Sequence, residues 1–77
     1  MRKVYANDPE ALVETLETEV MRDFAETYIE FMIRAHSDYY DSADDYITQL
    51  NSILKYFGSD VMVKDVIRDD KGIYFLI

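Results

Sequence analysis

The stretch DPEALVETLETEVMRDFAETYIEFMIRAH, residues Asp8–His36, decides the fold, because it is the longest run with helical periodicity in the chain. It opens with a strong start signal. Asp8 can cap exposed backbone N–H groups, and Pro9 suits the first helical position. We therefore predict one long helix over Asp8–His36, with the rest of the chain packed around it.

The two halves of this predicted helix differ in how much of their circumference is apolar. The first half has a narrow apolar face, made of Leu12, Val13, Leu16, Val20 and Phe24. From Met21 onward the apolar set is wider and comprises Phe24, Ala25, Tyr28, Ile29, Phe31, Met32, Ile33 and Ala35. Such a surface needs cover on more than one side, either from the same chain or from a second copy. For the second case, a homodimer, the predicted contacts are Phe24, Tyr28 and Met32.

A second helix is predicted over Ala43–Phe57, after a connection at Ser37–Ser42. Its apolar residues form a single stripe, made of Tyr46, Ile47, Leu50, Ile53, Leu54 and Phe57. Ser42 and Asp45 resemble a capping box at its start, and Gly58 is a natural stop. The short connection implies an antiparallel pair of helices.

Three short strands complete the prediction, at Arg2–Ala6, Val61–Arg68 and Ile73–Ile77, with Gly72 in a tight turn between the last two. The sequence of Ile73–Ile77 has no polar residue, which favours a central strand. The predicted fold class is α+β: an antiparallel two-helix hairpin packed on a small two- or three-stranded antiparallel sheet. The element order is strand, helix, helix, strand, strand, in one domain of 77 residues.

Composition excludes several classes of protein. The absence of cysteine rules out disulfides and thiolate metal sites. An apolar content of 49% is too high for a disordered acidic tail. No apolar run has the length of a membrane span, and residues 1–8 contain no signal-peptide core, so we expect a cytoplasmic protein without membrane contact.

No residue set has the pattern of a catalytic or metal site. The adjacent His36, Ser37 and Asp38 cannot line up as nucleophile, base and orienting acid. The acidic run from Asp38 to Asp45 departs from the EF-hand pattern, because it lacks the sixth-position glycine and the twelfth-position glutamate. We expect no enzyme activity, no metal and no cofactor.

Direct nucleic-acid binding is also not expected. Two glycines cannot build a glycine-rich phosphate loop. The basic residues near the C-terminal strands are interspersed with acids that cancel them; the basic residues are Lys55, Lys64, Arg68 and Lys71, and the acids are Asp65, Asp69 and Asp70.

The uneven charge is the feature that points to a function. Residues 8–45 contain twelve carboxylates and two arginines, a net charge of −10, whereas the rest of the chain carries +2. An acidic surface attracts basic proteins, and tyrosines beside the acids are frequent interface anchors. The predicted partner-binding residues are Glu14, Glu17, Glu19, Asp23, Glu26, Glu30, Asp38, Tyr39, Tyr40, Asp41, Asp44 and Asp45, with Tyr46 as a third aromatic anchor.

The leading hypothesis is a non-enzymatic acidic module that binds a basic protein partner. In being short, acidic, cysteine-free and rich in Tyr and Asp, the composition is similar to that of small phage or mobile-element inhibitors, which occupy nucleic-acid-binding sites on host proteins. The alternative hypothesis is a small structural or regulatory homo-oligomer that uses the wide apolar face of the first helix. A third reading, a charge run that only keeps the protein soluble, also stays open.

Repulsion between carboxylates predicts a dependence of stability on salt. Five like-charge pairs at helical spacing outnumber three favourable pairs on the first helix, and each changes stability by about 0.2–0.5 kcal/mol. Added sodium chloride should therefore raise the thermal midpoint modestly, because it screens the repulsion. A thermal midpoint that does not change with salt would contradict this expectation.

Overall fold

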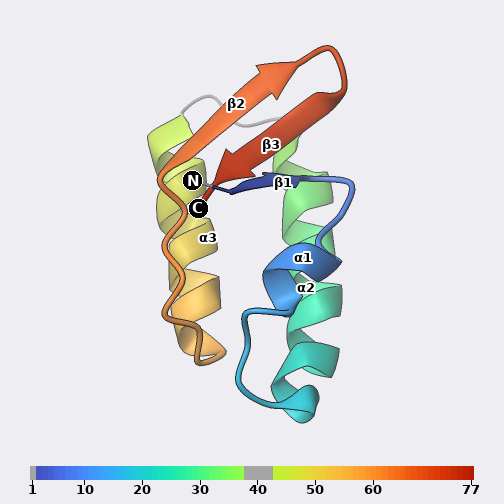
Figure 1. The fold of residues 1–77 in the computed structure, drawn as a ribbon, viewed down its shortest axis with the longest axis vertical. Coiled ribbons are helices and arrows are strands. Elements are labelled where there is room, and N and C mark those ends of the chain that lie inside the picture. The colour runs from blue at the N-terminus through green and yellow to red at the C-terminus, as the bar shows by residue number, and fades with distance from the viewer. Residues whose placement is uncertain (1, 38–42) are drawn as a thin grey trace.

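The computed structural model describes residues 2–37 and 43–77, with only the backbone of residues 36, 37 and 43. Along the chain the elements are β1 (Lys3–Tyr5), α1 (Glu10–Val13), α2 (Glu19–Ser37), α3 (Ala43–Tyr56), β2 (Asp65–Asp69) and β3 (Gly72–Leu76). The long helices α2 and α3 lie side by side and antiparallel, and the sheet packs across one end of the pair (Figure 1). The predicted α+β class and the antiparallel helix pair are confirmed.

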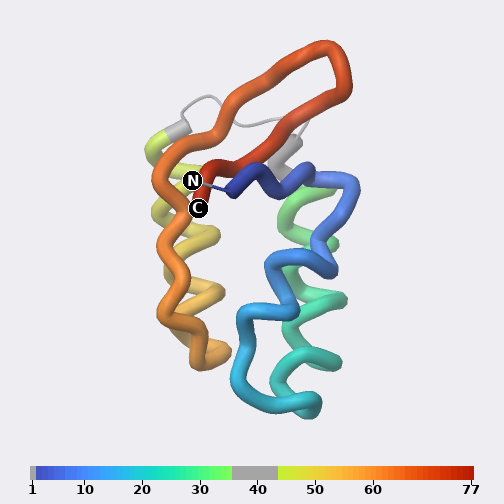
Figure 2. The backbone as a smooth tube through the Cα atoms, viewed as in Figure 1, coloured from blue at the N-terminus to red at the C-terminus, as the bar shows by residue number. Residues whose placement is uncertain are grey.

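The three strands form one antiparallel sheet in the order β1-β3-β2. The central position predicted for the last strand is confirmed: Phe75 of β3 is opposite Val4 of β1 on one side and Val66 of β2 on the other. The two chain ends lie together (Figure 2), because Arg2 and Ile77 exchange backbone hydrogen bonds of 2.9 and 3.0 Å.

The predicted single helix over Asp8–His36 is wrong, because residues 14–18 separate α1 from α2. The hydroxyl of Thr15 donates to the Leu12 carbonyl at 2.6 Å, and the N–H of Leu16 donates to Val13 rather than to Leu12. These local bonds replace the i to i+4 ladder, as β-branched threonines often do. A new helix then begins at Glu19, where the Thr18 hydroxyl caps the N–H of Met21 at 3.2 Å.

The predicted cap at Asp8 is also wrong. Pro9 occupies the N-cap position of α1, no side chain caps that helix, and the N–H of Asp8 donates to the Tyr5 carbonyl. The break also changes which residues are buried: Leu16 is 1% exposed, whereas Val20 and Phe24, predicted on the same buried face, are 66% and 70% exposed. A continuous helix would have kept these residues in line, but the chain reverses its direction between α1 and α2 (Figure 1).

The end of α3 follows the prediction, whereas the strand after it begins later than predicted. Gly58, at φ +91°, ends the helix, and the N–H of Ser59 donates to the Leu54 carbonyl at 2.9 Å, as in a Schellman motif. The predicted strand Val61–Arg68 begins only at Asp65. In the segment before it, the side-chain amide of Asn51 accepts from the N–H of Val63 (2.7 Å) and donates to its carbonyl (3.1 Å), so the backbone of Val63 pairs with a helix instead of a strand.

The core lies between the helix pair on one side and the sheet, α1 and the segment 61–64 on the other. Phe75 of β3 stacks on Tyr46 of α3, with ring centroids 5.6 Å apart, and both are almost fully buried. The other buried apolar residues are Val4, Leu12, Val13, Leu16, Ala25, Ile29, Met32, Ile33, Leu50, Leu54, Val63, Val66 and Ile73. Each element therefore contributes at least one side chain to the core.

Several sequence predictions fall outside the described residues. Asp38, Tyr39, Tyr40 and Asp41 of the predicted partner-binding set lie there, as does Ser42 of the predicted capping box. The tyrosine-and-aspartate connection between the helices therefore stays a prediction.

The amide of Asn51 offers a test of this fold. Replacing Asn51 with alanine leaves a partly buried N–H and C=O of Val63 without their partner, and we expect a loss of about 2 kcal/mol in the free energy of unfolding. Gln49→Ala removes an exposed amide from the same helix and should change stability by less than about 0.5 kcal/mol. Equal effects of the two substitutions in urea denaturation would contradict the role of the Asn51 amide.

Candidate protein-binding surface

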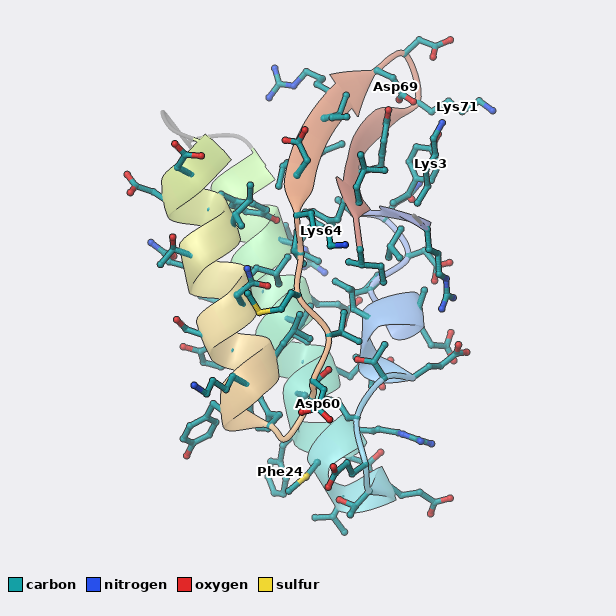
Figure 3. All side chains as sticks on the ribbon, turned by 60° about the vertical axis from the view of Figure 1, so that its left-hand side comes forward. Lys3, Phe24, Asp60, Lys64, Asp69 and Lys71 are labelled. Atoms are coloured by element: carbon teal, nitrogen blue, oxygen red, sulfur yellow. The ribbon has the colours of Figure 1, made fainter. Side chains whose placement is uncertain are left out.

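A row of exposed apolar side chains runs along α2 on the side that the other described residues leave uncovered. We call it the aromatic row; it comprises Val20, Phe24, Tyr28 and Phe31, which are 55–71% exposed. The steps of four, four and three residues keep the row on one side of the helix. Phe24 projects from the end of α2 farthest from the β2–β3 turn (Figure 3). An exposed row of this size on a small domain is typical of a binding site.

The aromatic row continues to the end of α3 through neighbouring rings. Tyr28 lies 6.3 Å from Phe57 between ring centroids, and Phe57 lies 5.1 Å from Tyr56 in an edge-to-face contact. Tyr56 is 82% exposed. The apolar surface therefore spans both helices.

A shallow groove of about 370 Å³ lies between the two helices, beside the aromatic row. Its lining residues are Tyr28, Phe31, Met32 and Ala35 of α2 and Thr48, Gln49, Ser52 and Ile53 of α3. We call it the interhelical groove. None of these eight lining residues carries a charge, although 31% of the residues in the chain are charged. The sheet and α1 contribute no side chain to it, so it belongs to the open side of the helix pair.

A second row on α2 consists of carboxylates. We call it the carboxylate row; it comprises Glu19, Asp23, Glu26 and Glu30, all of them exposed. Three of its members each precede a member of the aromatic row, so the two rows run parallel, roughly 100° apart around the helix. The helix α2 therefore has three sides: a buried one, an aromatic one and an acidic one.

The remaining predicted site residues lie outside the carboxylate row. Glu14 and Glu17 are exposed in the connection between α1 and α2, so their predicted helical pairing is lost. Asp44 and Asp45 lie in the first turn of α3, on the other helix from the carboxylate row. Of the predicted oligomer contacts, Phe24 and Tyr28 are exposed, whereas Met32 is only 5% exposed, at the floor of the interhelical groove.

The tyrosine Tyr46, a predicted aromatic anchor, is in the core and not on the surface. It is 1% exposed and stacks on Phe75. Its position on the apolar stripe of α3 explains this burial, because the stripe faces the sheet. This predicted role for Tyr46 is wrong.

A larger hollow, of about 670 Å³, lies between the tip of the β2–β3 hairpin, the end of α2 and the turn after β1. Three basic and three acidic side chains line it, namely Arg34, Arg68 and Lys71 against Glu30, Asp69 and Asp70. The formal charges that line the hollow therefore sum to zero.

The outer face of the sheet is organised by contacts within the chain. The Tyr5 hydroxyl donates to Asp69 at 3.1 Å, and the Tyr5 ring lies 5.4 Å from that of Tyr74. The ammonium of Lys3 stands 4.9 Å above the Tyr74 ring. These tyrosines therefore hold the strands together and leave little ring surface for a ligand.

Nothing among the described side chains has the geometry of a metal site: no three His, Asp or Glu residues converge there. The described helices also include none that is long and apolar enough to cross a membrane. Comparison with protein-family models, curated proteins and solved structures found no match.

Sequence reasoning identified part of this surface. The wide apolar set from Met21 onward indicated that α2 has more apolar surface than one layer can cover, which is the case. The sequence analysis did not predict that Val20 and Tyr56 are exposed. The exposure of Val20 could have been predicted from Thr15 and Thr18, because these threonines precede it and break the helix. Nothing in the sequence pattern indicated that Tyr56 is exposed.

The Tyr5–Asp69 contact predicts a pH dependence. Partial burial and the hydrogen bond to Asp69 raise the pKa of the Tyr5 phenol above 10.0. A raised folded-state pKa means that the stabilisation is fully present below the unfolded pKa and is lost as the pH rises through the folded-state pKa. We expect stability to fall in alkaline solution, and Tyr5→Phe to reduce that fall.

Urea denaturation at neutral pH and at about pH 9 to 11 would measure this effect. Tyr56→Phe is the matched control, because it removes an exposed hydroxyl away from the sheet. If wild type and Tyr5→Phe lose stability in parallel, the hydroxyl of Tyr5 does not carry the effect.

Proposed function

We propose that this protein is a non-enzymatic binding module that inserts the exposed side of α2 into a groove of a basic partner protein. The observation that carries the proposal is the pairing of two exposed rows on one helix, the aromatic row and the carboxylate row. Aromatic side chains supply contact area, and the carboxylates supply attraction and orientation. An apolar groove with a rim of lysine and arginine is complementary to both.

The two rows contribute to different steps of binding: the carboxylate row to the encounter and the aromatic row to the affinity. Exposed carboxylates accelerate encounter with a basic surface over about a Debye length, which is close to 8 Å at physiological ionic strength. The phenylalanines and the tyrosine contribute affinity once they leave water, at about 25 cal/mol per Å² of apolar surface. The partner must therefore offer both features on one surface.

The finer proposal is that the partner uses this groove for nucleic acid, so that binding of the module inhibits it. The carboxylate row runs from Glu19 to Glu30, a rise of eleven residue steps or about 16 Å, and carries four charges. One charge per about 5.5 Å is roughly two thirds of the charge density of one DNA strand, which has one per about 3.4 Å. The same lysines and arginines that bind phosphates would be attracted to this row. The proposal includes the cytoplasmic location expected from the sequence.

Affinity capture with charge-reversed variants tests the proposal. The tagged protein is incubated with lysate of the source cells, bound proteins are identified by mass spectrometry, and the binding is repeated with purified partner. We expect a basic partner whose affinity falls at least tenfold on Asp23→Lys with Glu26→Lys, and falls with added salt. Nucleic acid should compete with the module for the purified partner.

The matched control is Asp60→Lys with Asp70→Lys, which changes the net charge equally but lies outside α2. Equal loss of binding in both double variants would mean that net charge alone attracts the partner. Unchanged binding after reversal on α2 would refute the proposal.

A further inference from the structure

The aromatic row and the interhelical groove have a shape that suits a second copy of this chain. The row is a ridge of large side chains, and the groove lies directly beside it, since Tyr28 and Phe31 belong to both. A two-fold rotation would bring the ridge of each copy against the groove of the other, the arrangement of an isologous interface. We propose that a second copy covers this face, so that the free protein is a homodimer.

The exposed area is sufficient for a dimer of moderate stability. An aromatic side chain presents about 150–250 Å², so the exposed fractions of Phe24, Tyr28, Phe31 and Tyr56 amount to roughly 550 Å². A standard interface buries about 800 Å² on each partner. Val20 and the groove floor add to the aromatic area, so this face supplies most of such an interface.

Charge also favours a second copy over a basic protein as the occupant of the groove. The basic side chains of a partner gain no electrostatic attraction from a groove whose eight lining residues are all uncharged. Two copies, by contrast, meet there without placing a charge in the contact. The carboxylate row of each copy lies on a different side of α2 from the aromatic row, so it stays in water.

The charge of the two copies determines how dimerisation depends on salt. Each copy carries a net charge of −8, so two copies repel one another at long range. Salt screens that repulsion and leaves the apolar contact intact. Self-association should therefore strengthen as salt is added, opposite to the binding of a basic partner.

A form of regulation follows, and it rests on the proposed function. The aromatic row cannot be covered by a second copy and by a partner at once, whereas the carboxylate row is exposed in both states. A basic partner would first meet the carboxylates of the dimer and then replace the second copy on the aromatic row.

Sedimentation equilibrium across the micromolar range, at low and high sodium chloride, tests the dimer. We expect the average mass to rise from 9.1 kDa toward twice that value with concentration, and the dimer dissociation constant to fall with salt. Phe24→Ser and Phe31→Ser should each weaken the dimer about tenfold or more, as loss of a central aromatic anchor does. Both residues are largely exposed in one chain, so thermal melts of dilute protein should show folded variants.

Met62→Ser is the matched control, because Met62 is also an exposed apolar residue, at 61%, and does not line the groove. It should leave the dimer unchanged. A species of 9.1 kDa under all conditions would overturn the proposal. So would a dimer that salt weakens, or one that neither phenylalanine substitution affects.

The double variant Asp23→Lys with Glu26→Lys separates this inference from the proposed function. It should weaken binding to the basic partner and strengthen the dimer, because it lowers the repulsion between copies. A monomeric protein with carboxylate-dependent partner binding would refute the dimer alone. A dimer of this geometry without such a partner would refute the proposed function alone.

Discussion

The stacking of Phe75 on Tyr46 joins the two layers of this fold, and the remaining contacts depend on it. Phe75 lies on the central strand, so β1 and β2 are both held by hydrogen bonds to the strand that carries it. Tyr46 lies near the start of α3, so the same contact holds the helix pair against the sheet. The pairing of β1 with β3 brings the chain ends together, and the sheet is complete only with β3 between β1 and β2.

Two layers are too few to bury every apolar side chain of α2. The sheet, α1 and the segment 61–64 cover one side of the helix pair, and no further element among the described residues covers the other. At 77 residues, folding buries only about 60–65% of the surface that the unfolded chain exposes. The exposed aromatic row is the consequence of that limit. The same constraint that leaves the core thin therefore provides the surface on which the proposed function and the proposed dimer depend.

Short polar side chains hold this fold where regular secondary structure ends. Thr15 and Ser59 share a hydroxyl contact of 3.0 Å; since Thr15 donates to Leu12, Ser59 donates to Thr15 and accepts from the N–H of Val61. Asn51 pairs with the backbone of Val63 in place of a strand. At the edge of the sheet, Asp65 accepts from the N–H of Val66 at 2.8 Å and so occupies a donor that would otherwise be free to pair with another strand. The contacts of Thr15 with Ser59 and of Asn51 with Val63 join residues far apart in sequence, which is why periodicity did not reveal them.

The sequence by itself determined the class of fold, the two long helices, the central strand and the uneven charge, because each follows from the periodicity or composition of adjacent residues. Gly58 and Gly72, both at positive φ, ended a helix and shaped a turn as their residue type predicts. Only the tertiary structure decided that the first helix breaks at Thr15–Thr18, since local hydroxyl bonds and packing against Ser59 outweigh a continuous helical pattern. It also decided which apolar residues of α2 stay in water. Burial depends on how many layers the rest of the chain can supply, and no local pattern contains that information.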